Sequence, residues 1–396
     1  MPKQYFFQAG SFEDISYAEL IAVSEIYGLN RDVVHRFSNN IFLVKSKDIS
    51  EDILLKIFNR LGGFVRFGYI VEDLDTFLER YFDRTERVVF GLSVLSGSRK
   101  DDFKFLKRLG NELKRGFKEY GISSRFLFPK DRNMELNAAQ ISNNGVLAKG
   151  FELSILRNEK GEIYGSTVSI QDIEGYIRRD MDKPYTNTEM GTLPPKLARI
   201  MVNLCSLKDG VIWDPFCGSG TLPMESAVLG YNFLASDVDE YAVNGTDENI
   251  KWLNAQGDLA NIVYETFKLD ILNPDSNVIK KLKNTNISAI VCEPFMGPPQ
   301  KKLLSESKAN ELLSSVEQLY KGLFSLLDER IKVRGIKMVL IIPSYKTDRG
   351  WKSIGIRDIV SNRWEVLNSY YSPNRDLKWS RKNSIITRNI FILRRT

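Results

Sequence analysis

The residues best suited to chemistry in this sequence are three aspartates, each predicted to end a strand. Asp214 follows the apolar run Val211–Trp213, Asp237 ends the next predicted strand, and Asp270 ends a third. Any one of them alone is typical of a helix cap or of a surface residue. All three at successive strand ends predict one polar site, because ligands of open parallel sheets bind at the carboxyl ends of the strands.

The segment Asp214–Thr221 (DPFCGSGT) is predicted to be the loop that binds a cofactor. Its glycines, Gly218 and Gly220, allow the backbone to approach a ligand closely. A carboxylate at Asp214 would repel the phosphates of a dinucleotide or of ATP, and no phosphate-loop lysine follows Gly220. S-adenosylmethionine has no phosphate and carries an ammonium and a sulfonium group, so it is the cofactor that suits this loop.

The same hypothesis gives roles to the other two acids. Asp237 would accept hydrogen bonds from both hydroxyls of a ribose, and Asp270 would take the amino group of the adenine. Neighbouring positions complete the set. The predicted cofactor-binding residues are Asp214, Phe216, Gly218, Gly220, Thr221, Asp237, Val238, Asp270 and Ile271.

A second loop, Glu293–Pro299 (EPFMGPP), follows the apolar run Ile287–Val291. Prolines in an exposed stretch at a strand end make a loop rigid. A carboxylate, a carbonyl and an aromatic ring in such a loop can hold a flat base with its amino group towards the cofactor. We therefore predict that Glu293, Pro294 and Phe295 are the catalytic residues. Glu293 would accept a hydrogen bond from the amine and offset the positive charge that develops on it.

Both loops depend on the elements predicted from Leu193 onward, where apolar runs alternate with amphipathic helices. Such alternation predicts a doubly wound parallel sheet. Between Gln4 and about Gly161, short strands alternate with helices in the manner of small α+β layers with antiparallel sheet. The predicted fold class is therefore α/β, with a doubly wound parallel sheet preceded by an α+β region.

Composition restricts the function further. The chain has 396 residues, 43% hydrophobic and 27% charged, which is typical of a globular protein with two or three domains. His35 is the single histidine, so catalytic triads and multi-histidine metal sites are disfavoured. Three widely spaced cysteines support neither a disulfide framework nor a zinc cluster. Without an apolar stretch of membrane-spanning length or a signal peptide, we expect a cytoplasmic protein and no membrane partner.

Two basic stretches make nucleic acid a candidate partner. Such runs are more often solvated faces, but aromatic residues in or beside the second stretch favour a nucleic-acid footprint. The first lies on the predicted helix 103–120 and contains Lys104, Lys107, Arg108, Lys114, Arg115 and Lys118. The second is the final segment and contains Arg375, Lys378, Arg381, Lys382, Arg388, Arg394 and Arg395.

Several motifs resemble those of the THUMP-domain tRNA guanine-N2 methyltransferases, most closely the archaeal and eukaryotic type that modifies guanosine-10 of tRNA. The Asp214–Thr221 loop looks like motif I of amino-methyltransferases that act on nucleobases. The further segments that resemble this family are Tyr164–Thr167, Gln171–Tyr176, Arg178–Met181 and Gly191–Ala198.

The resemblance implies four regions. They are an N-terminal ferredoxin-like domain (1–85), a THUMP-like RNA-binding domain (86–162), a connector with a cofactor-side motif (163–192) and the Rossmann-like methyltransferase domain (193–396). In the family, the THUMP part grips the acceptor end of tRNA. Some members require a small activating protein subunit; without one, we expect a monomer.

The reactive loop departs from the family, whose catalytic motif reads Asp-Pro-Pro-Tyr. Here Glu293 matches the acid and Pro294 the first proline, while Phe295 and Met296 replace the second proline and the tyrosine. Glutamate adds about 1.5 Å of reach through one methylene group. Phe295 can take over the stacking on the base from a shifted loop.

The leading hypothesis is S-adenosylmethionine-dependent methylation of an exocyclic amino group in RNA, at N2 of a guanosine in tRNA. One alternative is an RNA-binding protein on a methyltransferase fold with weak or no catalysis, which the altered reactive loop favours. Another is a DNA amino-methyltransferase. The THUMP-like region and the absence of a recognisable DNA-reading motif argue against that third hypothesis.

Overall fold

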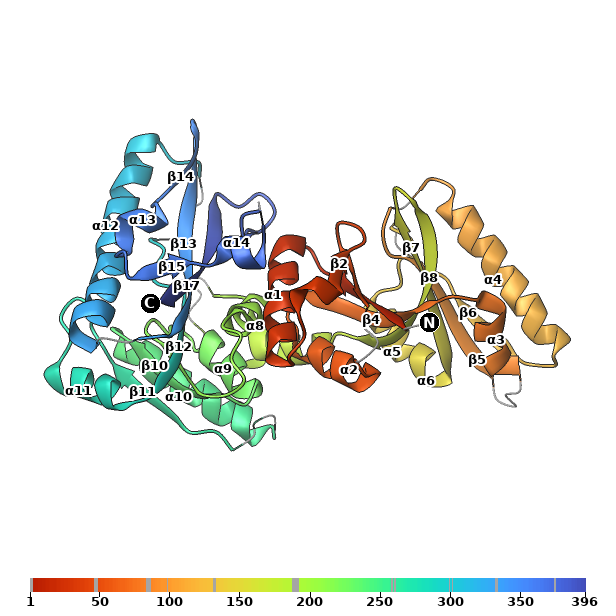
Figure 1. Cartoon of the computed structure of the whole chain (residues 1–396), viewed down its shortest axis with the longest axis horizontal. Coiled ribbons are helices and arrows are strands. Elements are labelled where there is room, and N and C mark those ends of the chain that lie inside the picture. Colours follow the sequence, from red (N-terminus) through yellow and green to blue (C-terminus); the bar gives the residue numbers. More distant parts are fainter. Residues whose placement is uncertain are drawn as a thin grey trace. The chain divides into compact units, whose positions relative to one another are not determined.

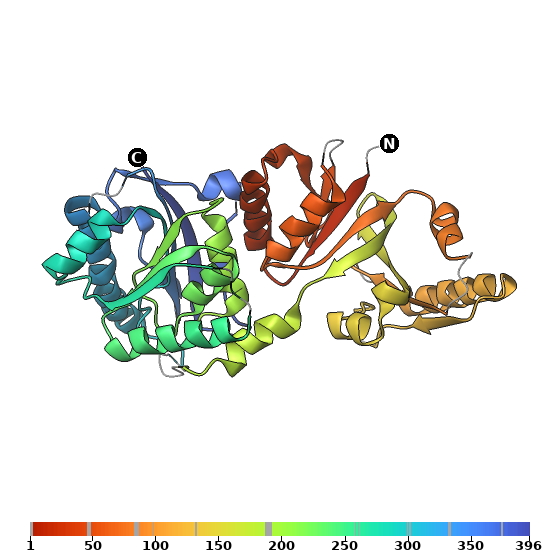
Figure 2. The ribbon, with the colours of Figure 1, turned by 90° about the horizontal axis from the view of Figure 1, so that it is seen from below.

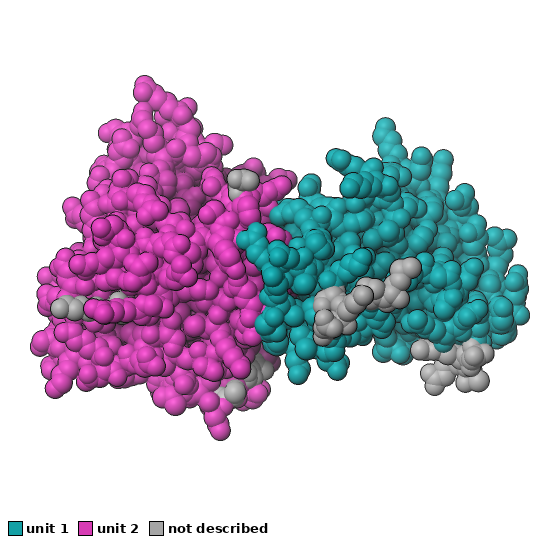
Figure 3. Space-filling model, in the orientation of Figure 1, with its two compact units in different colours: residues 1–13, 27–59, 63–173 teal, residues 14–26, 60–62, 174–396 magenta. Residues whose placement is uncertain are grey.

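The computed structural model describes residues 3–45, 49–82, 87–97, 99–130, 133–186, 192–257, 259, 261–298, 300, 302–331, 334–373 and 375–396. The chain forms two compact units, which Figure 3 colours separately. Unit 1 comprises residues 1–13, 27–59 and 63–173, and unit 2 comprises residues 14–26, 60–62 and 174–396. The predicted boundary at 85/86, Gly191 and Pro299 lie outside the described residues, and the four predicted domains stay predictions. Within the described part of the chain, no helix is long and apolar enough to cross a membrane.

Unit 1 is built on one eight-stranded sheet of order β2-β3-β1-β4-β8-β7-β5-β6 (Figure 1). Its pairs are antiparallel except that β5 runs parallel to both β6 and β7. The strands are β1 (Gln4–Ala9), β2 (Val34–Arg36), β3 (Ile41–Lys45), β4 (Phe64–Val71), β5 (Val88–Val94), β6 (Ser124–Leu127), β7 (Gly150–Asn158) and β8 (Gly161–Ile170).

The longest helix of unit 1, α4, shows why this sequence is helical. Its buried positions are Asp102, Leu106, Gly110, Leu113 and Phe117, which form one stripe at helical spacing against the core. The opposite face is exposed and basic. The helices of this unit are α2 (Glu51–Arg60, of which the last residue belongs to unit 2), α3 (Leu74–Phe82), α4 (Asp102–Glu119), α5 (Ala138–Asn143) and α6 (Val146–Lys149). Arg31–Val33 forms a 3-10 turn.

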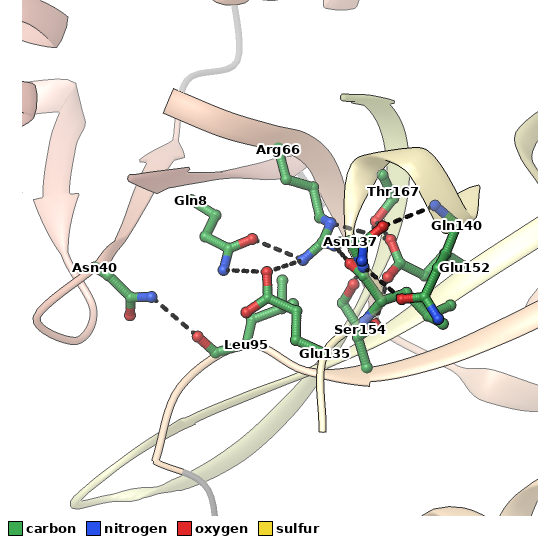
Figure 4. Close-up of polar contacts among 12 residues, drawn as sticks. Gln8, Asn40, Arg66, Leu95, Glu135, Asn137, Gln140, Glu152, Ser154 and Thr167 are labelled. Carbon is green, nitrogen blue, oxygen red and sulfur yellow. Dashed lines mark hydrogen bonds and ion pairs between the residues drawn. The ribbon is translucent and has the colours of Figure 1, made fainter. Parts of the chain in front are cut away.

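A buried polar cluster crosses the middle of this sheet (Figure 4). The Arg66 side chain on β4 is 3% exposed and donates to Gln8 on β1 at 2.7 Å and to Glu135 at 3.1 Å. Its Nε lies 3.1 Å from the carboxylate of Glu152 on β7, which also accepts the hydroxyl of Thr167 on β8 at 2.6 Å. A buried charge is tolerated only with such partners, so the cluster fixes neighbouring strands to one another and to the loop that carries Glu135.

Unit 2 contains a nine-stranded sheet with the main order β11-β10-β9-β12-β13-β17-β15. Strands β9 to β13 are parallel, and β17 is antiparallel to β13. This confirms the predicted α/β class and doubly wound sheet. The strands are β9 (Val211–Asp214), β10 (Asn232–Asp237), β11 (Tyr264–Lys268), β12 (Ile287–Cys292), β13 (Lys337–Thr347), β14 (Gly350–Ser353), β15 (Trp364–Val366), β16 (Lys378–Trp379) and β17 (Ile386–Arg395).

Helices cover both faces of this sheet (Figure 2). Side chains that alternate along β10 enter different cores: Leu234 packs in the cluster with α12, whereas Phe233 and Ala235 pack in the cluster with α9 and α10. The helices are α1 (Glu13–Ile26), α7 (Ile173–Ile177), α8 (Pro195–Leu204), α9 (Thr221–Val228), α10 (Glu240–Ala255), α11 (Ser276–Asn284), α12 (Glu306–Ser325), α13 (Ile356–Ile359) and α14 (Asn368–Tyr371). Arg178–Asp182 and Leu326–Ile331 form π-helical turns.

Helix α1 belongs to unit 2 although it lies near the start of the chain. Its buried Glu19 accepts hydrogen bonds from the side-chain amide of Asn203 on α8 and from the N–H of Gly62, each at 2.7 Å. At the other end of the chain, strand β15 has only three residues. The Asn368 side chain bonds the Ile390 carbonyl and the Ile392 N–H of β17 and so replaces the ladder that a longer strand would make.

Candidate active site

The two predicted loops lie at the carboxyl edge of the unit 2 sheet. Asp214 is the last residue of β9, Asp237 is the last residue of β10, and Glu293 directly follows β12. The strand order reverses between β9 and β12, and this switch point is where open α/β sheets bind their ligands.

Asp214 is a buried carboxylate without a cationic partner among the described residues. Its side chain is 2% exposed and accepts the N–H of Phe216 at 3.0 Å. Burial raises the pKa of Asp214 well above its ordinary value; the Phe216 N–H lowers it, while the charges of Asp237 and Glu293 raise it further. The structure therefore brings these three carboxylates close enough to interact, and the ionised form of Asp214 lacks a compensating positive charge.

Asp237 ties the end of β10 to the glycine loop. Its two carboxylate oxygens accept the N–H groups of Gly218 and Asp239, each at 3.0 Å. Burial raises the pKa of Asp237, and these N–H groups oppose the rise without cancelling it. Each oxygen keeps a lone pair for a further donor such as a ribose hydroxyl.

The two glycines of the loop adopt conformations that favour glycine. Gly218 has a φ of +51° and Gly220 a φ of +79°. A Cβ atom on Gly220 would lie 2.9 Å from the hydroxyl of Thr246, so α10 packs directly against the loop. Any larger residue at Gly220 would move the loop away from α10.

The remaining predicted cofactor residues differ in exposure. Thr221 is buried at the start of α9, Ile271 is buried, Phe216 is half-buried against the core, and Val238 is 59% exposed. Asp270 lies two residues beyond the end of β11.

Asp270 differs from the other two predicted acids because it caps its own loop. Its carboxylate accepts the N–H of Leu272 at 2.9 Å and the amide of Asn273 at 3.3 Å. Burial acts to raise its pKa, but these hydrogen bonds lower it below the ordinary value. Among the described residues, no hydrogen bond joins Asp270 to Asp214 or Asp237.

The reactive loop contains an ion pair that sequence reasoning missed. Arg388 on β17 donates to both carboxylate oxygens of Glu293, at 2.5 and 3.5 Å, and both side chains are 13% exposed. The Arg388 guanidinium lies 4.9 Å from the centre of the Trp379 ring. Pro294 is buried and Phe295 is 47% exposed, so the loop presents an aromatic ring beside an oriented carboxylate.

A second buried cluster lies behind the glycine loop and was also missed. Glu225 on α9 is fully buried and contacts Arg179 and Arg199, each at 2.6 Å. Next to it, the ammonium of Lys183 donates to the Thr221 hydroxyl at 3.1 Å. A glutamate inside the apolar helix TLPMESAV was the available signal, because a buried charge needs partners.

The basic residues of the two stretches differ in how many of them are ion-paired. All six basic residues of α4 are exposed, and Arg108 lies a long 3.9 Å from the carboxylate of Glu112. In the final segment most of the basic residues are ion-paired, which leaves less charge for an anionic partner than the sequence suggests. The pairs are Arg375–Asp14, Lys378–Asp376, Arg388–Glu293, Arg394–Glu365 and Arg395–Asp328.

The donor set of the glycine loop fits S-adenosylmethionine. Two buried carboxylates with raised pKa values suit a ligand that carries positive charge and no phosphate. Glycines with positive φ let the backbone lie against such a ligand.

Comparisons with known proteins agree with this chemistry. Residues 184–346 match the family model described as RMKL-like, methyltransferase domain. A tRNA (guanine(10)-N2)-dimethyltransferase of Methanocaldococcus jannaschii is 24% identical over 326 residues, which covers 78% of this chain and 85% of the relative. A protein of Methanothermococcus thermolithotrophicus named "Probable tRNA (guanine(10)-N2)-dimethyltransferase" is 31% identical over 133 residues, 33% of this chain and 73% of the relative. The crystal structure of a possible methylase from Clostridium difficile 630 has a TM-score of 0.50 at 14% identity and covers 100% of this chain and 99% of that chain.

The fold and the matched domain define a Rossmann-like methyltransferase whose cofactor is S-adenosylmethionine. Within that class, the chain belongs to the family of tRNA (guanine-N2) methyltransferases. The family expected from the motifs is thereby confirmed, and its THUMP domain stays a prediction for residues of unit 1.

Proposed function

We propose that this protein transfers a methyl group to the exocyclic N2 of a guanosine in tRNA, at the guanosine-10 position named for its relatives. The observation that carries the proposal is the meeting of two loops at one switch point. Glu293 of the reactive loop is close enough to raise the pKa of Asp214 in the cofactor loop.

The cofactor loop would hold S-adenosylmethionine, which supplies the methyl group when bound. Asp214 would pair with its ammonium group, because no other cation balances that carboxylate in the described structure. Asp237 would accept the ribose hydroxyls while it keeps its bond to Gly218. Val238, Asp270 and Ile271 would contact the adenine.

The reactive loop would orient the guanine. Arg388 fixes the Glu293 carboxylate, whose remaining lone pairs can accept a hydrogen bond from the amino group. That bond would align the nitrogen and offset the positive charge that develops on it. Phe295 is exposed enough to stack on the base, and buried Pro294 keeps the loop rigid. The target nucleotide would have to be flipped out to reach this loop.

Unit 1 would bind the body of the RNA, in the role of a THUMP-like domain. The exposed basic face of α4 supplies a surface for phosphates. Unit 1 also contains a hollow of about 760 Å³ whose lining includes the basic residues Arg36, Arg157 and Lys160. Arg157 is ion-paired with Asp102 and Glu162, so the exposed Lys160 is the cation better placed to meet an RNA.

The alternative of an RNA-binding protein without efficient catalysis has one observation in its favour. The carboxylate of Glu293 is already occupied by Arg388, and an ion pair can hold a side chain for structural reasons alone. The two functions differ in one measurable property, which is methyl transfer.

The test combines calorimetric titration with S-adenosylmethionine and labelled-methyl transfer to total tRNA in the same preparation. We expect binding and transfer by the natural protein, and transfer abolished with binding kept in Glu293→Ala. The matched control is Glu365→Ala, which removes a carboxylate paired with Arg394 on the same sheet and should change neither quantity. Binding without transfer to any RNA would favour the alternative, and absence of binding would overturn the cofactor site itself.

A further inference from the structure

Lys183 is a buried lysine at the edge of the cofactor loop. Its side chain is 3% exposed, and its ammonium donates to the hydroxyl of Thr221, the first residue of α9, at 3.1 Å. An ammonium has three N–H donors, and the described residues provide an acceptor for one of them. The other two N–H groups of the Lys183 ammonium therefore have no protein acceptor in the described part of the chain.

The carboxylates near Lys183 do not balance the positive charge of its ammonium group. Burial lowers the pKa of Lys183, and the charges of Asp180 and Glu225 oppose the shift. Glu225 is already shared between Arg179 and Arg199, and no carboxylate lies within ion-pair distance of Lys183 among the described residues. In addition, the start of α9 is the positive end of its helix dipole, where a cation is disfavoured and an anion is stabilised.

The segment that carries Lys183 is anchored to the glycine loop. The side chain of Asn249 on α10 accepts the Tyr185 N–H at 2.8 Å and donates to the Tyr185 carbonyl at 2.9 Å and to the Ser219 carbonyl at 2.8 Å. Lys183 is thus held at the same loop as Asp214, although neither residue pairs with the other.

We propose that Lys183 binds the carboxylate of the amino-acid end of S-adenosylmethionine. That end of the cofactor carries one ammonium and one carboxylate. The buried carboxylate of Asp214 would pair with the first, and the buried ammonium of Lys183 at the edge of the loop would pair with the second. The inference rests on the proposed function, because it assumes that the loop binds this cofactor. It adds a residue from outside the glycine loop and gives the cofactor's amino-acid end its anion-binding group.

The experiment compares two ligands that share a nucleoside. S-adenosylhomocysteine has the amino-acid end, whereas 5′-methylthioadenosine lacks it, and calorimetry gives the affinity of both for the full chain. In Lys183→Met we expect the affinity for S-adenosylhomocysteine to fall roughly 10- to 100-fold, as for a lost hydrogen bond to a charged group, with 5′-methylthioadenosine unaffected. Lys183→Arg should keep part of the preference for S-adenosylhomocysteine.

The matched control is Lys337→Met. Lys337 is a half-buried lysine that, like Lys183, donates to a hydroxyl, that of Tyr371 at 2.7 Å. It starts β13 and so lies at the opposite edge of the sheet. The Lys337→Met protein should bind both ligands with the affinities of the natural protein. Binding of 5′-methylthioadenosine at full stoichiometry shows that the Lys183→Met site is folded.

The outcomes separate this inference from the proposed function. An equal loss of both ligands in Lys183→Met, or an unchanged ratio of the two affinities, overturns the carboxylate role of Lys183 alone. Failure of the natural protein to bind either ligand overturns the proposed function and this inference with it.

Discussion

The two loops of the candidate active site hold their carboxylates in opposite ways. Asp214 and Asp237 are bound by backbone N–H groups, and the pKa of each lies above its ordinary value. Glu293 is bound instead by the guanidinium of Arg388. The cofactor loop thus keeps unbalanced negative charge for a cationic ligand, whereas the reactive loop neutralises its acid and fixes the direction in which it points.

The ion pair with Arg388 explains how the reactive loop can work with a glutamate, Glu293, where the family motif has an aspartate. A glutamate has one more rotatable bond than an aspartate, and Arg388 removes that freedom by contacting both oxygens. The stack of Arg388 on Trp379 in turn restricts the guanidinium. We therefore regard Arg388 as the positioning residue of the reactive loop.

Among the conservative changes to the reactive loop, the largest expected effect comes from shortening the acid. Glu293→Asp restores the acid of the family motif but withdraws the carboxylate by about 1.5 Å, away from Arg388. Because a misplacement of about 1 Å costs roughly 100-fold in rate, we expect methyl transfer to fall by about that factor. Single-turnover transfer to tRNA at saturating S-adenosylmethionine measures it. Transfer as fast as in the natural protein would show that Arg388 does not set the geometry.

The next effect concerns the positioning residue itself. Arg388→Ala should lower single-turnover transfer about tenfold, in keeping with the loss of a charge-assisted pair, and leave the affinity for S-adenosylmethionine unchanged. Added guanidinium ion should restore part of the rate. Arg394→Ala on the same strand removes an exposed pair with Glu365 and serves as the control. A matching loss in both variants, without rescue, would mean that Arg388 acts only through stability.

The affinity for S-adenosylmethionine should depend on pH, because the carboxyl group of Asp214 in the cofactor loop gains or loses a proton. Below the raised pKa of Asp214 the side chain is neutral and cannot pair with a cation, and above it the side chain is ionised. Affinity for S-adenosylmethionine should therefore rise with pH, by at most about tenfold per unit for this one proton, and level off above that pKa. Titrations from mildly acidic to neutral pH measure the slope. Asp214→Asn should weaken binding and reduce the slope, and an unchanged slope would contradict the assignment.

The smallest effect is expected from changes to the basic face of α4 in unit 1, which is distant in sequence from both loops. Replacing Lys107, Lys114 and Arg115 of α4 by alanine should raise the KM for tRNA several-fold and weaken its salt dependence, because phosphate contacts are lost. The turnover number should stay the same. Replacement of Arg381 and Lys382, which are exposed in the final segment, provides the comparison. An effect confined to the latter pair would move the RNA surface to unit 2.

Local patterns were enough to predict the strand ends and the glycine loop. Asp214 and Asp237 end β9 and β10 as expected, because apolar runs and glycines report on their immediate surroundings. Asp270 is displaced by two residues from β11 and bonds to its own loop, which no periodicity reveals.

The partners of the charged residues could not be predicted. Arg388 pairs with Glu293 across 95 positions, and Lys183 meets Thr221 across 38. Such pairs arise only when the sheet order brings distant segments together. For the same reason the final basic segment suggested a nucleic-acid surface, although most of its charges are balanced by acids elsewhere in the chain.

The different roles of the two loops can be separated by two measurements on Asp237→Ala and Glu293→Ala, the affinity for S-adenosylmethionine and the single-turnover rate at saturation. We expect Asp237→Ala to weaken binding roughly 10- to 100-fold and largely to keep the rate. We expect Glu293→Ala to keep the affinity and to lose the rate by about 100-fold or more. Loss of affinity in Glu293→Ala with an unchanged rate at saturation would show that Glu293 serves the cofactor and not the reaction.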